Sequence, residues 1–109
     1  MLVGKSARGN EFLLKKKARK GDLWFHVKDA AGAHVLLGQR EPTPVSTEDK
    51  AFAAGLAVHF SKLRGKGRVD VMVADVKDIH PTKGAVPGQV SVRHYSTMLS
   101  EEVLPDRER

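Results

Sequence analysis

The feature that most constrains the fold is the stretch GDLWFHVKDAAGAHVLLG, residues 21–38, in which two apolar runs flank a short break. In the first run Leu23, Phe25 and Val27 alternate with Trp24 and His26, which is the period of a β-strand with one buried face. Residues 29–32 interrupt that period with an aspartate and small side chains, and a second apolar run begins at His34. We therefore predict an antiparallel hairpin whose turn uses Gly32 for a positive φ.

The two faces of the first predicted strand differ in chemistry. The side chains expected in the core are Leu23, Phe25 and Val27. The opposite face carries Trp24, His26 and Lys28, a set that can stack on a base and hold a phosphate. The alternative is structural: Trp24 packs under a neighbouring helix, the more common role of a large aromatic side chain, and His26 only satisfies a backbone group.

One helix is predicted before this hairpin in the sequence, and a second is predicted after it. Asn10 is a good N-cap for a short basic helix that ends near Lys20 and Gly21. Ser46 or Thr47 can begin a longer amphipathic helix that lies close against a sheet. Its large apolar residues at helical spacing are Phe52, Leu56, Phe60 and Leu63, and another side carries the small residues Ala53, Ala54, Gly55 and Ala57.

Further strands are predicted at 1–3, 69–74 and 90–95, and the segment 80–89 is a loop rich in proline and glycine. This order of elements predicts an α+β fold with a mostly antiparallel sheet, one long amphipathic helix and one short basic helix. The length favours a single compact domain over 1–109, with its core in about 2–95 and a polar end at 105–109.

The formal net charge of +6 is concentrated in residues 1–20, where Glu11 is the only acid. The cations there are Lys5, Arg8, Lys15, Lys16, Lys17, Arg19 and Lys20. Cations this close repel one another, and a polyanion such as RNA relieves that repulsion; a solvated basic tail is the alternative. A second basic cluster, which also suits a helix C-terminus, follows the long helix at Lys62, Arg64, Lys66 and Arg68.

Several classes of chemistry lack their residues in this chain. Without cysteine there is no disulfide, thiolate ligand or thiol nucleophile. The histidines do not have the spacing of a zinc motif, and no phosphate-loop, dinucleotide or GxSxG signature is present. No apolar run reaches the roughly 18 to 20 residues of a membrane span, and the first residues do not form a signal peptide. We expect no metal, cofactor or catalytic residue, and a soluble, cytoplasmic protein.

Four pieces in a fixed order carry a resemblance to a known family. They are GNEFLLKKKARKGDLWFHVKDAAGAHVLLG, a proline-containing connector, an alanine-rich helix ending HFSKLRGKGRVDV, and DVKDIHPTKGAVPGQV. Over about residues 2–95 the chain resembles the NFACT-R domain of the NFACT family. The positions that match the family's motif are Asn10, Asp22, Trp24, His26, Gly32, His34, Lys83, Gly84, Pro87 and Gly88.

The resemblance implies an RNA-binding domain, with large ribosomal subunits and tRNA as the family's partners in the quality control of stalled nascent chains. Full-length members also carry an N-terminal domain, helix-hairpin-helix elements and a coiled-coil arm, which 109 residues cannot hold. The tail synthesis that a full-length factor supports is therefore not transferred to this chain, which is either a free-standing domain or a fragment.

We predict a non-catalytic domain that binds structured RNA, either tRNA or ribosomal RNA, without DNA specificity or a membrane partner. The predicted RNA contacts are Lys15, Lys16, Lys17, Arg19, Lys20, Trp24, His26, Lys28, Lys62, Arg64, Lys66 and Lys83. Two alternatives stay open. An RNA-processing enzyme would use His26 and His34 as acid and base, and requires both imidazoles near one substrate phosphate. A protein-interaction module would bind RNA no more tightly than its net charge dictates.

Overall fold

The computed structural model describes residues 1–38, 45–82 and 89–104. Within these ranges the main sheet has five antiparallel strands in the order β1-β3-β2-β4-β7, and a second sheet pairs β5 with β6. The strands are β1 (Leu2–Gly4), β2 (Leu23–Val27), β3 (His34–Leu37), β4 (Val69–Asp75), β5 (Ile79–Pro81), β6 (Val90–Val92) and β7 (Ser96–Ser100). The predicted α+β fold with a mostly antiparallel sheet is confirmed.

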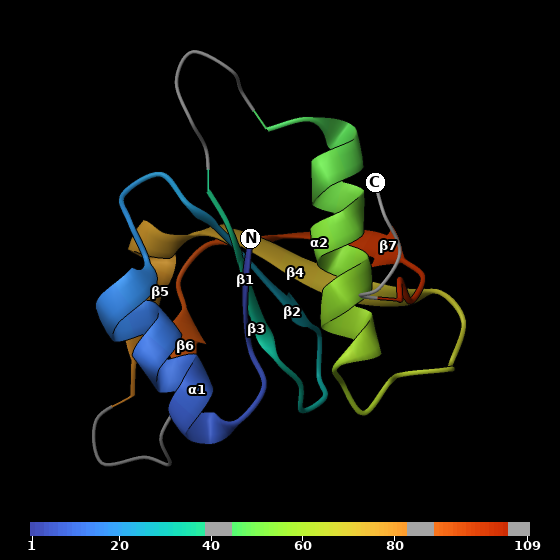
Figure 1. Ribbon diagram of the computed structural model, residues 1–109, viewed down its shortest axis with the longest axis horizontal. Helices are drawn as coiled ribbons and strands as arrows, with labels where there is room; N and C mark the ends of the chain where they lie inside the picture. The colour runs from blue at the N-terminus through green and yellow to red at the C-terminus, as the bar shows by residue number, and fades with distance from the viewer. Residues whose placement is uncertain (39–44, 83–88, 105–109) are drawn as a thin grey trace.

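Both faces of the main sheet are covered (Figure 1). Helix α2 (Thr47–His59) crosses one face. Helix α1 (Ala7–Phe12), its continuation as the π-helix η1 (Leu13–Lys17), and the pair β5–β6 lie on the other. A short 3-10 turn, η2 (Val76–Asp78), joins β4 to β5. The central strand β2 is therefore buried from two sides.

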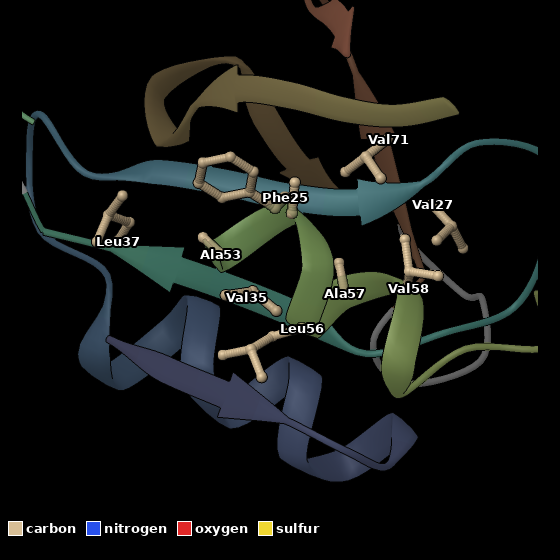
Figure 2. Close-up of a cluster of buried hydrophobic side chains, with 10 residues drawn as sticks. Phe25, Val27, Val35, Leu37, Ala53, Leu56, Ala57, Val58 and Val71 are labelled. Atoms are coloured by element: carbon tan, nitrogen blue, oxygen red, sulfur yellow. The ribbon is translucent and has the colours of Figure 1, made fainter. Parts of the chain in front are cut away.

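The first core layer lies between α2 and the sheet (Figure 2). Strands β2 and β3 supply Phe25 and Val35, both fully buried, and α2 meets them mainly with alanines. Small side chains let the helix axis approach the strands closely, as the sequence predicted. Of the four large apolar residues on the predicted helix only Leu56 is buried, while Phe52, Phe60 and Leu63 pack at the margin of the cluster.

The second core layer lies on the opposite face and centres on Trp24, which is 1% exposed. Its buried neighbours come from η1, β3, β4 and β5, and are Leu13, Leu36, Ala74 and Ile79. The alternating pattern of the hairpin thus describes two cores and not a core and a surface. Because Trp24 is packed, the predicted stacking of this side chain on RNA is wrong.

The hairpin forms as predicted, but the long helix ends at His59, before the predicted Phe60 and Leu63, and the short helix begins earlier than expected. Ser6, not Asn10, is its N-cap, and the Ser6 hydroxyl accepts a hydrogen bond from the Gly9 amide at 2.9 Å. In α2 the cap is Ser46, which accepts from the Asp49 amide at 3.0 Å. Asn10 lies inside α1 and is buried. Because it does not cap the helix, its side chain can hydrogen-bond to another part of the chain.

Two further expectations are corrected by the structure. In the hairpin turn the positive φ belongs to Asp29, at 60°, and not to Gly32. An aspartate tolerates this region better than most side chains. The predicted strand 90–95 is shorter than expected, because β6 ends at Val92, and a separate strand beyond it, β7, pairs with β4 at the edge of the main sheet. The sequence of β7, STMLS, does not alternate between apolar and polar residues, and so it did not predict a strand.

Gly55 allows the C-terminal segment to pass directly over α2. The Val103 amide donates to the Gly55 carbonyl at 3.0 Å, and a Cβ added to Gly55 would lie 2.2 Å from Cγ2 of Val103 and 2.9 Å from the Glu101 carbonyl oxygen. Only a residue without a side chain fits this contact.

We predict that Gly55→Ala lowers the free energy of unfolding by about 1–3 kcal/mol, because overpacking outweighs the gain in helix propensity. Urea unfolding of the two proteins measures the difference. Gly38→Ala is the matched control, since a Cβ there meets only Oδ1 of Asp22 at 3.6 Å. A Gly55→Ala protein as stable as the wild type would contradict the packing described.

Candidate nucleic-acid interface

Three aromatic rings form a cluster on the face of the sheet opposite α2. Adjacent strands β2 and β3 supply Trp24, His26 and His34. The rings of Trp24 and His26 are parallel, with an interplanar angle of 2° and centroids 5.6 Å apart. The His34 ring stands nearly perpendicular to both, with its centroid 5.4 Å from that of Trp24 and 5.2 Å from that of His26. The sheet register therefore brings both motif histidines together.

Asn10 connects this cluster to helix α1. Its Oδ1 accepts a hydrogen bond from the backbone amide of His34 at 3.1 Å, in a buried position. Gly4 lies against the same side chain, since a Cβ there would be 2.5 Å from Oδ1 of Asn10. Asn10 thus holds the start of β3 against α1. Asp22, another motif residue, has a similar structural role, because its carboxylate accepts from the Arg19 amide at 2.9 Å.

Burial keeps both clustered imidazoles neutral at pH 7. Desolvation lowers the pKa of His34 to about 4, and the nearby charge of His26 acts in the same direction. Desolvation also lowers the pKa of His26, although hydrogen bonding to the carbonyls of Val27 and Gly32 opposes it. In His26 the Nδ1 lies 2.6 Å from the Val27 carbonyl oxygen and donates to it. His26 does satisfy a backbone group, as one of the two sequence interpretations held.

The end of the hairpin is tied to the segment that follows α2. The amide of Ala33 donates to the Phe60 carbonyl at 3.0 Å, and the amide of Lys62 donates to the Ala31 carbonyl at 2.9 Å. Between these bonds Gly32 lies so close to Ser61 that a Cβ would come within 2.7 Å of the serine Cβ. Gly32 is therefore required for close approach, and not for a positive φ.

A charged network adjoins this junction. Nδ1 of His59 and Oε2 of Glu102 are 2.5 Å apart, and Nε of Arg64 is 3.5 Å from the same oxygen. The C-terminal segment after β7 thereby holds the end of α2 and positions Arg64.

A pocket of about 910 Å³, open to solvent, lies beside the aromatic cluster. Its walls come from β2, β3, the start of α1, the end of α2 and β6. The cationic side chains that line it are Lys5, Lys62 and Arg64, and Asp29 is its one acidic residue within the described chain. The Lys5 ammonium lies 4.5 Å from the centroid of the Phe60 ring. Aromatic, neutral polar and cationic groups thus share one concave surface.

The predicted basic residues do not form one continuous surface. The cations at 15–17 and at 19–20 are exposed around the end of η1, with Nζ of Lys15 3.7 Å from Glu11. Figure 1 shows α1 and η1 on one side of the view and the segment after α2 on the other. Lys62 and Arg64 instead border the pocket, while exposed Lys66 does not line it. Lys28 is half-buried.

Some motif positions lie outside the described residues. These are Lys83, Gly84, Pro87 and Gly88. The sequence analysis counted Lys5 only toward the charge of residues 1–20, named Phe60 only as an apolar residue of the long helix, and did not single out Ser61. No local signal marks these three, because their place at the pocket depends on how the end of α2 meets the hairpin.

The geometry required by the catalytic alternative is partly present. His26 and His34 are on the same face of the sheet and adjacent. The protonated form that a general acid needs is disfavoured, however, because burial lowers the pKa of both rings. Among the described residues no three His, Asp or Glu side chains are grouped to hold a metal ion. Nor is any helix in the described parts long and apolar enough to cross a membrane.

Comparison with known proteins assigns the family. Residues 1–94 match the model of the NFACT protein RNA binding domain, and the chain belongs to this family. Among its relatives, the Rqc2 homolog RqcH of Streptococcus suis (strain 05ZYH33) is 41% identical over 98 residues, which cover 90% of this chain and 17% of that protein. The Rqc2 homolog RqcH of Bacillus subtilis (strain 168) is 34% identical over 106 residues, covering 97% and 18%. The chain thus spans less than a fifth of these relatives.

A solved structure has the same fold. It is the C-terminal part of the fibronectin/fibrinogen-binding protein from Streptococcus suis, with a TM-score of 0.84 and 40% sequence identity. The match covers 94% of this chain and 40% of that one. The resemblance to the NFACT-R domain seen in the sequence is confirmed.

The lowered pKa of His34 predicts a pH-dependent stability. The unfolded chain takes up this proton below about pH 6.5, whereas the folded chain does so only near 4, so the free energy of unfolding falls as the pH drops through this window. We expect a loss of up to about 2 kcal/mol between pH 7 and pH 5, measured by urea unfolding.

The His34→Gln variant should show a smaller pH dependence, whatever its stability at pH 7, because only the lowered pKa of His26 then contributes in the same direction. His80→Gln, which removes an exposed imidazole on β5, should keep it. Equal pH dependence in His34→Gln and the wild type would contradict the assignment to His34.

Proposed function

We propose that this chain is a non-catalytic RNA-binding domain that recognises structured RNA, either tRNA or ribosomal RNA. The observation that carries the proposal is the set of seven cations in residues 1–20, every one of them exposed, with Glu11 the only acid among them. An exposed and largely uncompensated set of this kind attracts a polyanion through the release of its counterions. Membership of the NFACT protein RNA binding domain family supports the same partner.

The arrangement of the cations suggests how RNA is held. Lys16 and Lys17 lie at the exposed end of η1, while Lys62 and Arg64 lie beside the pocket. A partner that touches both groups has to extend around one side of the domain, which favours a folded RNA of some size. Such phosphate contacts supply affinity and orientation, whereas specificity comes from shape and from the few contacts that are not ionic.

The relatives suggest the cellular setting. Two of them are named as RqcH, homologs of Rqc2, and the NFACT family acts in the quality control of stalled nascent chains. We infer a role of this chain in ribosome-associated quality control, in the cytoplasm, with the large ribosomal subunit as its partner. Shared identity over most of the chain supports this inference.

The experiment that tests the proposal is equilibrium binding to a folded tRNA and to an unrelated duplex RNA across a salt series. We expect tighter binding to tRNA that persists near 0.15 M salt, roughly the physiological ionic strength. The double variant Lys16→Ala/Lys17→Ala should bind both RNAs more weakly, with a slope of log K against log salt shallower by about one to two.

The matched control is Lys50→Ala/Lys77→Ala, which removes the same charge from exposed sites on α2 and η2. It should leave the affinity for tRNA nearly unchanged. Equal losses in both double variants would show that binding follows net charge alone, and equal, salt-erased binding of tRNA and duplex would point to a protein partner.

A further inference from the structure

The rings of the aromatic cluster differ in how accessible they are from the pocket. Trp24 is fully buried, so neither face of its indole is available to a ligand. His26 is only partly buried, lines the pocket and lies parallel to Trp24. It is therefore the more accessible ring of the parallel pair, and a flat ligand ring that enters the pocket can reach it.

His34 retains hydrogen-bonding capacity beside this ring. Its ring lines the same pocket and is 3% exposed, yet its Nδ1 has no hydrogen-bond partner among the described residues. Buried polar atoms usually have a partner, and an unpaired one is costly. Because no Nδ1 contact selects a tautomer, either ring nitrogen can carry the single proton of the neutral imidazole. The Nδ1 atom is itself buried, so a ligand pairs with it only by entering the pocket as far as the His34 ring, where it meets a donor or an acceptor.

The pocket has both charged residues and an aromatic floor, which is formed by Trp24, His26 and His34. The floor is neutral at pH 7, because the pKa values of both histidines are lowered. Lys5, Lys62 and Arg64 are exposed and line the same pocket, with Asp29 as the single acid there among the described residues. A bare phosphate has nothing to gain from the floor, and an apolar ligand makes no use of the cations. A nucleotide, with a flat polar base and an anionic phosphate, uses both.

We propose that this pocket binds one unpaired nucleobase of an RNA, stacked on the accessible ring of His26 and hydrogen-bonded by His34, with the adjacent phosphates held by Lys5, Lys62 and Arg64. This inference rests on the proposed RNA-binding function and specifies its ligand. RNA with an unpaired nucleotide is preferred over an uninterrupted duplex, in which no base can leave the stack without cost.

The test uses the complete 109-residue chain and two RNA hairpins that differ by one base. One carries a single-nucleotide bulge, and the other has an abasic nucleotide at the same place, so that their charge and backbone are matched. Base–aromatic stacking predicts that the wild type binds the base-containing bulge roughly 5- to 100-fold more tightly. Equal dissociation constants for the two hairpins would overturn the base-binding proposal.

Variants assign the effect to His26. We expect His26→Gln, which lacks an aromatic ring, to lose the preference for the base, and His26→Phe, which retains a flat ring, to keep it. His80→Gln, an exposed site outside the pocket, should bind as the wild type does. A preference that survives in His26→Gln would overturn the stacking assignment.

The wild-type protein also provides a direct signal without any substitution. Trp24 is the only tryptophan of the chain, and its ring centroid lies 5.6 Å from that of His26. Its fluorescence should change on titration with the base-containing hairpin and not with the abasic one. Absence of binding to either hairpin and to tRNA would instead refute the RNA-binding function itself, which separates the two failures.

Discussion

The packing of Trp24 is the interaction on which the rest of this structure depends. Trp24 belongs to one buried cluster with residues of η1, β3, β4 and β5, and this cluster forms the layer that covers one face of the main sheet. On the other face Phe25 is fully buried, and the alanines of α2 let that helix lie close to the strands. Burying a side chain as large as that of Trp24 contributes a large apolar area, which a domain of about 100 residues needs.

The same packing places the pocket. Since Trp24 occupies the middle of the face, the next residues on that face, His26 on β2 and His34 on β3, fall at the margin of the core. Asn10 then holds β3 to α1, and the bonds between the hairpin and the end of α2 bring Lys62 beside the rings. A motif that resembles a ligand-binding surface in the sequence is thus largely a set of structural contacts.

Several motif residues owe their identity to backbone contacts. Asp22 accepts from a turn amide, Asn10 from a strand amide, and Gly32 leaves room for Ser61. These roles explain why such different residue types occur together in one short motif. In the proposed function, the exposed lysines and arginines attract a polyanion at long range, and the pocket adds the shape and hydrogen bonds that charge alone cannot supply.

The sequence by itself determined the hairpin, the capped long helix, the α+β class and the basic N-terminal surface, because periodicity, cap chemistry and charge are local properties. It also carried the family resemblance, since the motif pieces keep their order along the chain. Only the tertiary structure decided that Trp24 is buried, that β7 joins β4, and that Lys5 meets the segment after α2. The reason is physical: side chains alternate between the two faces of any strand, and which of those faces is covered depends on elements distant in sequence.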